Sequence, residues 1–318
     1  GAEVWIAPYE ERDKRLVAGT ERLLGKTPVA AAEVPRGSWR CTLRPPAVGG
    51  LAPVVFPVLI SRSADAAHDI NLYAASEIPD GFLLVPGGTF GAGMDHLRGS
   101  RVQEAVTRDV FVARFPVTCD EYLAFLNELP ADEAARRAPR DDGRPWWIAE
   151  NGLWRFPTPA EDDRITWSGD LPVISVSWHD ALAWLAWRSA KDGRPWSLLH
   201  DLEHEKAARG VDRRTWSFGN EYDGSFSQTN VSLAGKSRPL PVGSFPADES
   251  PYGIRDLCGG VATWCLNAAE EPWRDHCSLR GGTWLHSSSY AHASYRRGEF
   301  RARTGRSIGF RACVRPGC

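Results

Sequence analysis

The block Leu279-Arg280-Gly281-Gly282-Thr283-Trp284 and the later block Ile308-Gly309-Phe310-Arg311 are the part of this 318-residue sequence that decides the fold. Each block places an arginine and glycine close to a large aromatic residue. The segment between them differs in character, because it is rich in serine, histidine, tyrosine and arginine. The two blocks therefore frame one polar segment near the carboxyl end of the chain.

Further short motifs precede these two blocks. Residues 205–210 read EKAARG, 216–223 read WSFGNEYD, and 241–264 read PVGSFPADESPYGIRDLCGGVATW. Together the five blocks strongly resemble, in order and approximate spacing, the domain of formylglycine-generating enzymes and their many non-catalytic relatives. The resemblance covers roughly residues 80–315 and implies an α+β, loop-rich, C-type-lectin-like formylglycine-generating-enzyme fold. It also implies that Arg280 and Arg311 are buried structural anchors.

The amino-terminal residues follow another pattern, that of short strands separated by turns. Trp39, Cys41 and Leu43 alternate with polar residues, residues 54–60 form a second apolar run, and 70–72 close the set; a period of two is typical of strands. The order LGKTP, VPRGSW and then a strand pair resembles the PEGA type of small β-sandwich. We therefore expect a PEGA-like β-sandwich domain over residues 1–76 and the formylglycine-generating-enzyme-like domain over 77–318. The stretch 74–81 is the expected linker, accessible over 74–78.

Three helices are predicted in the second domain. Apolar residues at helical spacing indicate a helix over 120–129, which Pro130 ends. Ser177, with Asp180 three positions later, is expected to cap a second helix after a strand over 172–177. A third helix runs over about 200–209 and stops at Gly210. Helical periodicity is then lost for about 100 residues, as in folds whose loops carry the ligand surface.

Composition excludes several classes of function. A hydrophobic fraction of 42% and a charged fraction of 25% are ordinary for a globular protein, and the net charge of −2 gives no global field to recruit nucleic acid or a membrane. No apolar run is long enough for a bilayer span, and the first residues lack a basic and then apolar stretch, so we expect a cytoplasmic protein. Seven cysteines without a CxxC pair favour buried, reduced thiols over a zinc ribbon or a complete disulfide framework.

The resemblance also states where metals would bind. The family's oxidase holds copper with two cysteines shortly after the RGG[ST] block, because Cu(I) prefers sulfur; in register, those positions are His286 and Ala291. Structural calcium in the family uses the Asn and Glu of a GNVWEW block, which here reads GGVATW over 259–264 and lacks both. A second calcium site near Asn230 and Asp248 stays open as an alternative.

His200 and His204 lie one helical turn apart, a spacing that helical zinc pairs use. The sequence between them is not that of a His-Glu-x-x-His motif. The alternative is that His200 caps the helix and that His204 is a satisfied, half-buried side chain. We therefore expect no metal cofactor, with calcium, copper and iron as the alternatives.

The polar segment 284–307 is the candidate functional surface. Hydroxyls, imidazoles and aromatic rings in one loop are typical of adaptable recognition surfaces, and several arginines there suit carboxylates or phosphates. A plain solvated loop and Ser–His catalysis are the alternatives, although no Gly-x-Ser-x-Gly elbow is present. The candidate ligand-binding residues are His286, Ser288, Tyr290, His292, Tyr295, Arg297, Arg301 and Arg303.

These observations favour a non-catalytic recognition or regulatory protein that binds a protein or peptide partner through the 284–307 region. The wording SFPADESPYGIRDLCGG (244–260) looks closest to versions fused behind bacterial serine/threonine kinases, which makes a component of a kinase or protease pathway one candidate partner, in signalling or defence. The chain itself has no kinase signature. The alternative is an iron- or copper-dependent oxidase of the same superfamily; in its ergothioneine-synthase branch an extra helical bundle supplies iron-binding histidines, and no such bundle is expected within residues 1–80.

Overall fold

The computed structural model describes residues 1–30, 32–61, 67–93, 102–268 and 275–317. The amino-terminal strands are β1 (Glu3–Arg12), β2 (Arg15–Ala18), β3 (Arg22–Lys26), β4 (Gly37–Arg44) and β5 (Val54–Ile60). They are followed by β6 (Phe82–Val85), β7 (Gly88–Ala92), β8 (Gln103–Thr107), β9 (Val110–Ala113), β10 (Arg140–Asp141), β11 (Arg144–Pro145), β12 (Ile148–Glu150), β13 (Leu153–Arg155) and β14 (Trp196–Leu198). The carboxyl-terminal strands are β15 (Ala262–Ala268), β16 (His276–Arg280), β17 (Arg296–Phe300), β18 (Ile308–Phe310) and β19 (Ala312–Val314). The helices are α1 (Cys119–Glu128), α2 (Ala131–Arg137), α3 (Trp178–Asp192) and α4 (Asp201–Arg209), with a short 3₁₀ turn, η1 (Ser288–Ala291).

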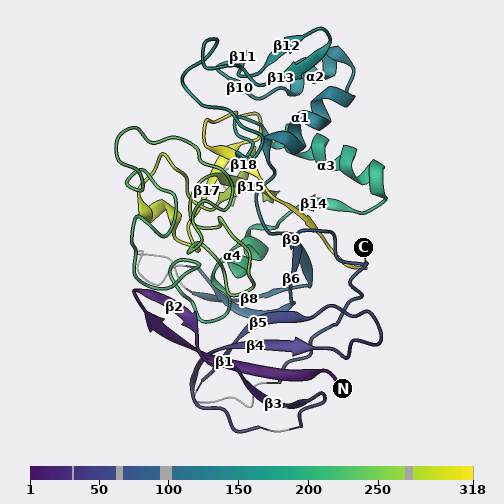
Figure 1. The fold of residues 1–318 in the computed structure, drawn as a ribbon, viewed down its shortest axis with the longest axis vertical. Coiled ribbons are helices and arrows are strands. Elements are labelled where there is room, and N and C mark those ends of the chain that lie inside the picture. The colour runs from purple at the N-terminus through teal and green to yellow at the C-terminus, as the bar shows by residue number, and fades with distance from the viewer. Residues whose placement is uncertain (31, 62–66, 94–101, 269–274, 318) are drawn as a thin grey trace.

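The amino-terminal strands form one sheet, in the order β2-β1-β4-β5 with β3 also paired to β1. Figure 1 shows this sheet at one end of the molecule and α1 to α3 at the other. The predicted alternation in β4 is confirmed, since Trp39, Cys41 and Leu43 are buried. The sandwich expected for residues 1–76 is not what the described residues build, because they place no second sheet on this one.

The rest of the chain, instead of a second sheet, covers the apolar face of the amino-terminal sheet. Ile6 and Phe56 belong to the same buried cluster as Phe111, Tyr252 and Ile254. Polar contacts cross the same boundary, for example from the Ser38 hydroxyl to the Asp212 carboxylate at 2.6 Å. This shared core explains why five strands need no sandwich of their own, since a sheet buries one face against whatever layer is adjacent.

Two four-stranded sheets organise the larger part of the chain. Their orders are β14-β19-β9-β6 and β17-β16-β15-β18, and three two-stranded pairs (β7-β8, β10-β11, β12-β13) lie outside them. In the second sheet, β15 pairs parallel with β18 and antiparallel with β16, so that three of the sequence blocks lie side by side. Gly309 is required there, because a Cβ on it would lie 2.1 Å from the Val173 carbonyl oxygen.

The three predicted helices are confirmed as α1, α3 and α4. Ser177 and Asp180 form the expected capping box at the start of α3. His200 caps α4, where its imidazole Nδ1 accepts a hydrogen bond from the Leu202 amide, and Gly210 ends that helix. Among the described residues, no helix combines the length and the apolar character that crossing a membrane requires.

Two predicted strands are wrong. Residues 70–72 are irregular in the structure. Residues 172–177 contain only an isolated bridge between Pro172 and Thr118, and Ser175 has φ of 61°, a left-handed conformation that interrupts any ladder. Six cysteines lie in the described residues, and all six are buried without a disulfide bond, as expected; Cys318 lies outside the described residues.

Candidate functional site

The polar segment begins at the tight turn that follows β16. Gly282 has φ of 69°, and a Cβ on it would lie 2.6 Å from the Cα of Ala291, so only glycine lets η1 pack against this turn. Trp284 and Phe310, at the two ends of the segment, are buried. The segment is therefore held at both ends, and it folds back over the sheet through η1 and β17.

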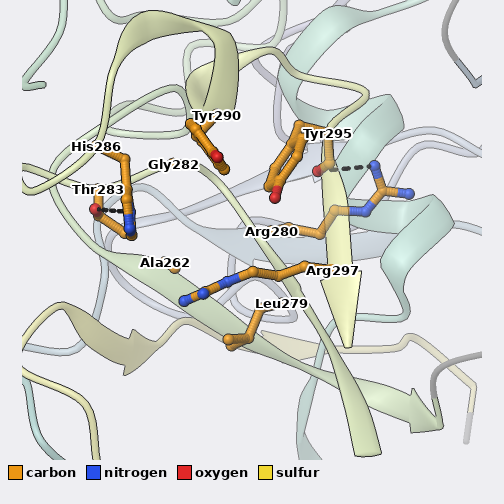
Figure 2. A pocket seen from close by; sticks show the side chains of 9 residues that line it. All are labelled: Ala262, Leu279, Arg280, Gly282, Thr283, His286, Tyr290, Tyr295 and Arg297. Carbon is orange, nitrogen blue, oxygen red and sulfur yellow. Dashed lines mark hydrogen bonds between the residues drawn. The ribbon is translucent and has the colours of Figure 1, made fainter. Parts of the chain in front are cut away.

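A small, shallow pocket opens between this segment and the sheet. Its lining residues are Ala262, Leu279, Arg280, Gly282, Thr283, His286, Tyr290, Tyr295 and Arg297. Four of them, His286, Tyr290, Tyr295 and Arg297, are among the eight candidates that sequence analysis selected. Figure 2 shows the three rings along one side of the opening, with the Arg297 side chain reaching across beneath them.

The rings form a continuous aromatic wall. The centroids of His286 and Tyr290 are 5.0 Å apart and tilted by 30°, and those of Tyr290 and Tyr295 are 5.1 Å apart at 69°. The imidazole is oriented by a 2.7 Å hydrogen bond between its Nδ1 and the Thr283 hydroxyl. Because the His286 carbonyl also accepts a bond from the Asn230 amide, this side of the pocket is fixed by both backbone and side-chain contacts.

Of the two arginines in the pocket, Arg280 is neutralised. It is 1% exposed, and its guanidinium donates to the Glu205 carboxylate at 2.9 Å and to the Ser294 carbonyl at 2.9 Å. Asp201 lies 3.6 Å from the same guanidinium. Burial acts to raise the pKa of Asp201, but the close imidazole of His200, whose Nδ1 lies 2.9 Å from the carboxylate, and the charge of Arg280 outweigh it and hold that pKa below its ordinary value.

Arg297 has no such partner. Its guanidinium makes no hydrogen bond or ion pair with any residue that the structure describes, and the pocket lining contains no carboxylate. Burial and the positive charge of Arg297 lower the pKa of His286, so the imidazole is neutral near pH 7. Burial raises the pKa of Tyr295, which keeps its hydroxyl protonated as a donor. The pocket therefore combines one uncompensated positive charge with neutral polar rings.

The other four candidates do not line this pocket. The ring of His292 packs edge-on against Trp216 at 4.8 Å, and the Ser288 carbonyl accepts from the indole of the same tryptophan. Arg301 donates to the Cys277 sulfur at 3.3 Å and lies over the Trp178 ring, and Arg303 is exposed. The single surface predicted from the sequence is thus divided into a pocket and residues that pack elsewhere.

Sequence reasoning missed Thr283 and Leu279 as pocket residues and read Arg280 only as an anchor. The anchor role of Arg280 is confirmed, and so is that of Arg311, which is 1% exposed and donates to four backbone carbonyls. Thr283 carried a usable signal, since it stands three positions before His286 on the same turn. Leu279 carried none, because apolar strand residues in a core and in a pocket look alike in sequence.

The two residues that the family resemblance assigns to the copper positions, His286 and Ala291, are a poor donor set for that metal. Ala291 offers no donor atom, and His286, whose Nδ1 is hydrogen-bonded to the Thr283 hydroxyl, can offer only its Nε2. A single imidazole nitrogen is not the sulfur pair that Cu(I) prefers. Cys277 lies outside the pocket lining, and burial raises the pKa of its thiol, which disfavours the thiolate that a metal needs. Within the described residues, no three histidine, cysteine or acidic side chains gather as metal ligands would.

The remaining metal candidates are likewise occupied or isolated. His204 is 1% exposed, not half-buried as predicted, and the structure gives its Nδ1 no hydrogen-bond partner among the described residues, so it is not the satisfied side chain that was expected. The Asp248 carboxylate accepts bonds from the Ser217 hydroxyl and the Cys258 amide. The described residues of 1–80 form strands and turns without a helix, so they contain no bundle to supply iron-binding histidines.

The chain is similar in sequence to known proteins. The profile of the sulfatase-modifying factor enzyme 1-like domain matches residues 71–316. A formylglycine-generating enzyme of Streptomyces coelicolor is 31% identical over 279 residues, which cover 74% of this chain and 86% of that enzyme. An inactive C-alpha-formylglycine-generating enzyme 2 of Bos taurus is 28% identical over 234 residues, which cover 63% of this chain and 75% of the relative.

The fold is also shared with a solved structure. PvdO from Pseudomonas aeruginosa superposes with a TM-score of 0.60 at 22% identity, over 74% of this chain and 94% of that one. This likeness shows the fold of the larger part of the chain.

Proposed function

The chain belongs to the sulfatase-modifying factor enzyme 1-like family, and from this premise we propose that it is a non-catalytic recognition protein that binds a protein or peptide partner through the 284–307 region. The proposal is supported by His286 and Ala291, which the family resemblance assigns to the positions of the oxidase's two copper-binding cysteines and which supply no thiolate. The first has become part of an aromatic and cationic pocket, and the second packs against Gly282. A family with both active and inactive relatives accommodates this outcome.

The pocket has the composition of a recognition site. Tyrosine and arginine are enriched among the few residues that dominate binding energy at protein interfaces, and here they surround one opening. Tyr290 is 42% exposed, so a partner can contact it without a rearrangement of the core. We extend the proposal to a partner from a kinase or protease pathway and to a cytoplasmic location.

The alternative function is a copper- or iron-dependent oxidase. It draws support from the similarity to the Streptomyces coelicolor enzyme. The donor set at the family's copper positions counts against it, because an alanine cannot replace a thiolate.

The remaining details of the architecture are also proposals. We propose that residues 1–76 are a PEGA-like domain that packs as a single sheet on residues 77–318, and that the latter have a C-type-lectin-like arrangement. The apolar cluster that both parts share supports a fixed packing between them.

Affinity capture from cells of the source organism tests the recognition function. Tyr290→Ala removes the central ring of the pocket wall, whereas Leu285→Ala removes a side chain of similar exposure (41%) that does not line the pocket. We expect quantitative mass spectrometry to recover the same partners with the wild type and with Leu285→Ala. Tyr290→Ala should lose most of them, because truncation of an anchor costs roughly 1–4 kcal/mol. Equal recovery with both variants would show that this pocket is not the binding site.

A further inference from the structure

We propose that the pocket takes a carboxylate group, which the Arg297 guanidinium binds while the group that carries it packs on the wall of His286, Tyr290 and Tyr295. The inference deepens the recognition function proposed above and rests on it for the biological partner. It concerns the class of group that enters the pocket, whatever molecule presents it.

Charge is the first argument. Glu205 neutralises the Arg280 guanidinium and Asp201 lies close to it, so Arg280 offers no net positive charge to a ligand. Arg297 lines the same pocket with no acidic partner in the described part of the chain. A half-buried guanidinium without a partner is costly to desolvate unless an anion arrives to pair with it.

The neutral groups around Arg297 agree with an anionic ligand. His286 has its pKa lowered by burial and by Arg297, so it does not add a second positive charge near pH 7. The Tyr295 hydroxyl stays protonated because burial raises its pKa, and a phenol donates well to a carboxylate oxygen. With no carboxylate in the lining, nothing in the pocket repels an anion.

The size of the pocket and its single unpaired charge indicate the class of ligand that it binds. The pocket is shallow and encloses space for about one water molecule, so it suits the tip of one side chain or a chain terminus rather than a whole small molecule. One guanidinium matches one carboxylate, since two parallel hydrogen bonds can form between the two planar groups. A phosphate dianion would leave charge unmatched, because Arg297 is the single uncompensated cation of this lining.

The probe experiment uses the full chain with isotope-labelled histidine, in which NMR follows the His286 ring. Benzoate carries a carboxylate on an aromatic ring, and benzamide is its neutral counterpart of the same shape. We expect benzoate to shift the His286 signals saturably and benzamide not to. Arg297→Gln should weaken benzoate binding at least about tenfold, which is the effect of losing one charge-assisted hydrogen bond. Arg297→Lys should bind with intermediate strength, because it keeps the charge without the planar fork.

Arg303→Gln is the matched control, because Arg303 is an exposed arginine of the same segment outside the pocket lining. It should bind benzoate as the wild type does, and thermal unfolding checks that both glutamine variants are folded. Equal binding of benzoate and benzamide, equal binding by Arg297→Gln, or no saturable shift with benzoate would each overturn the carboxylate assignment. Tighter binding of inorganic phosphate than of benzoate would overturn it too, in favour of a phosphate site.

Two peptides separate the sources of the carboxylate. One carries a glutamate beside a tyrosine with an amidated carboxyl end, and the other carries glutamine there with a free carboxyl end. The peptide that competes with benzoate identifies an acidic side chain or a chain terminus, and competition by neither overturns the inference for a peptide. Failure of the recognition function would look different: Arg297→Gln would lose benzoate yet capture the same cellular partners as the wild type.

Discussion

Replacement of Asp248 by asparagine should change how the stability of the protein depends on pH. Asp248 is 1% exposed, and its carboxyl accepts hydrogen bonds from the Ser217 hydroxyl and the Cys258 amide. Burial, with a contribution from nearby Asp256, raises the pKa of Asp248 to about 7. In the folded protein the carboxyl therefore holds its proton through a range in which an unfolded chain, with an aspartate pKa near 4, has lost it.

The sign and the size follow from this difference. A folded-state pKa above the unfolded one means that the native state binds more protons, so stability falls as pH rises from about 4 to about 7. With pKa values of about 4 and about 7, the contribution of this group is about 2.7 kcal/mol at pH 5 and close to zero at pH 8. The wild type should lose about 2.5 kcal/mol of unfolding free energy relative to Asp248→Asn between these two pH values.

Urea unfolding of both proteins at pH 5 and pH 8 measures this double difference. Groups that do not interact with Asp248 titrate alike in both proteins, so their contributions cancel. Asp163→Asn, which alters an exposed carboxyl, is the control and should give the same stability difference at both pH values within about 0.5 kcal/mol. If the difference in unfolding free energy between wild type and Asp248→Asn is also the same at pH 5 and pH 8, Asp248 is ionised at both pH values. That result would refute the reasoning from its burial.

Three further outcomes are expected. Arg280→Met should lower the unfolding free energy by about 3 kcal/mol, because it removes the buried cation 2.9 Å from one oxygen of Glu205 and leaves the other oxygen with Arg209 and the Gly93 amide; a melting temperature equal to the wild type would contradict this. Limited proteolysis should cut within the exposed residues 75–77, and the two fragments should stay together on gel filtration through their common apolar cluster; separation of the fragments would show that this cluster does not hold them. A Cys-x-Pro-x-Arg peptide incubated with the protein, copper and oxygen should keep its thiol, since Ala291 supplies no ligand, and aldehyde above the enzyme-free level would restore the oxidase alternative.

Local patterns were sufficient for α1, α3 and α4, whereas α2, which begins directly after Pro130, was not predicted. The capping pair Ser177 and Asp180, the cap His200 and the stop Gly210 each act on neighbouring backbone groups, so their effect is readable from spacing alone. The failed strand over 172–177 shows the limit of such reading, because its apolar residues are buried in irregular backbone that neighbouring segments bind.

The candidate site was likewise predictable from the sequence only in part. The sequence indicated the polar segment and four of the pocket residues, because an unusual mixture of side chains is visible in composition. It did not separate Arg297 from Arg301, since both are arginines of one segment. Arg301 contacts Cys277 and Trp178, whereas Arg297 lines the pocket. The path of the chain through η1 and β17 determines these two positions.

The sequence by itself thus determined the family, three of the helices and the buried arginines, because each of these depends on residue identity within one short block. Only the tertiary structure decided that the amino-terminal strands form a single sheet over a shared core. It alone decided that Arg280 is neutralised by Glu205 while Arg297 has no acidic partner among the residues that the structure describes. These outcomes depend on contacts between residues far apart in the chain, and the energy of a charge is set by the groups that surround it in space.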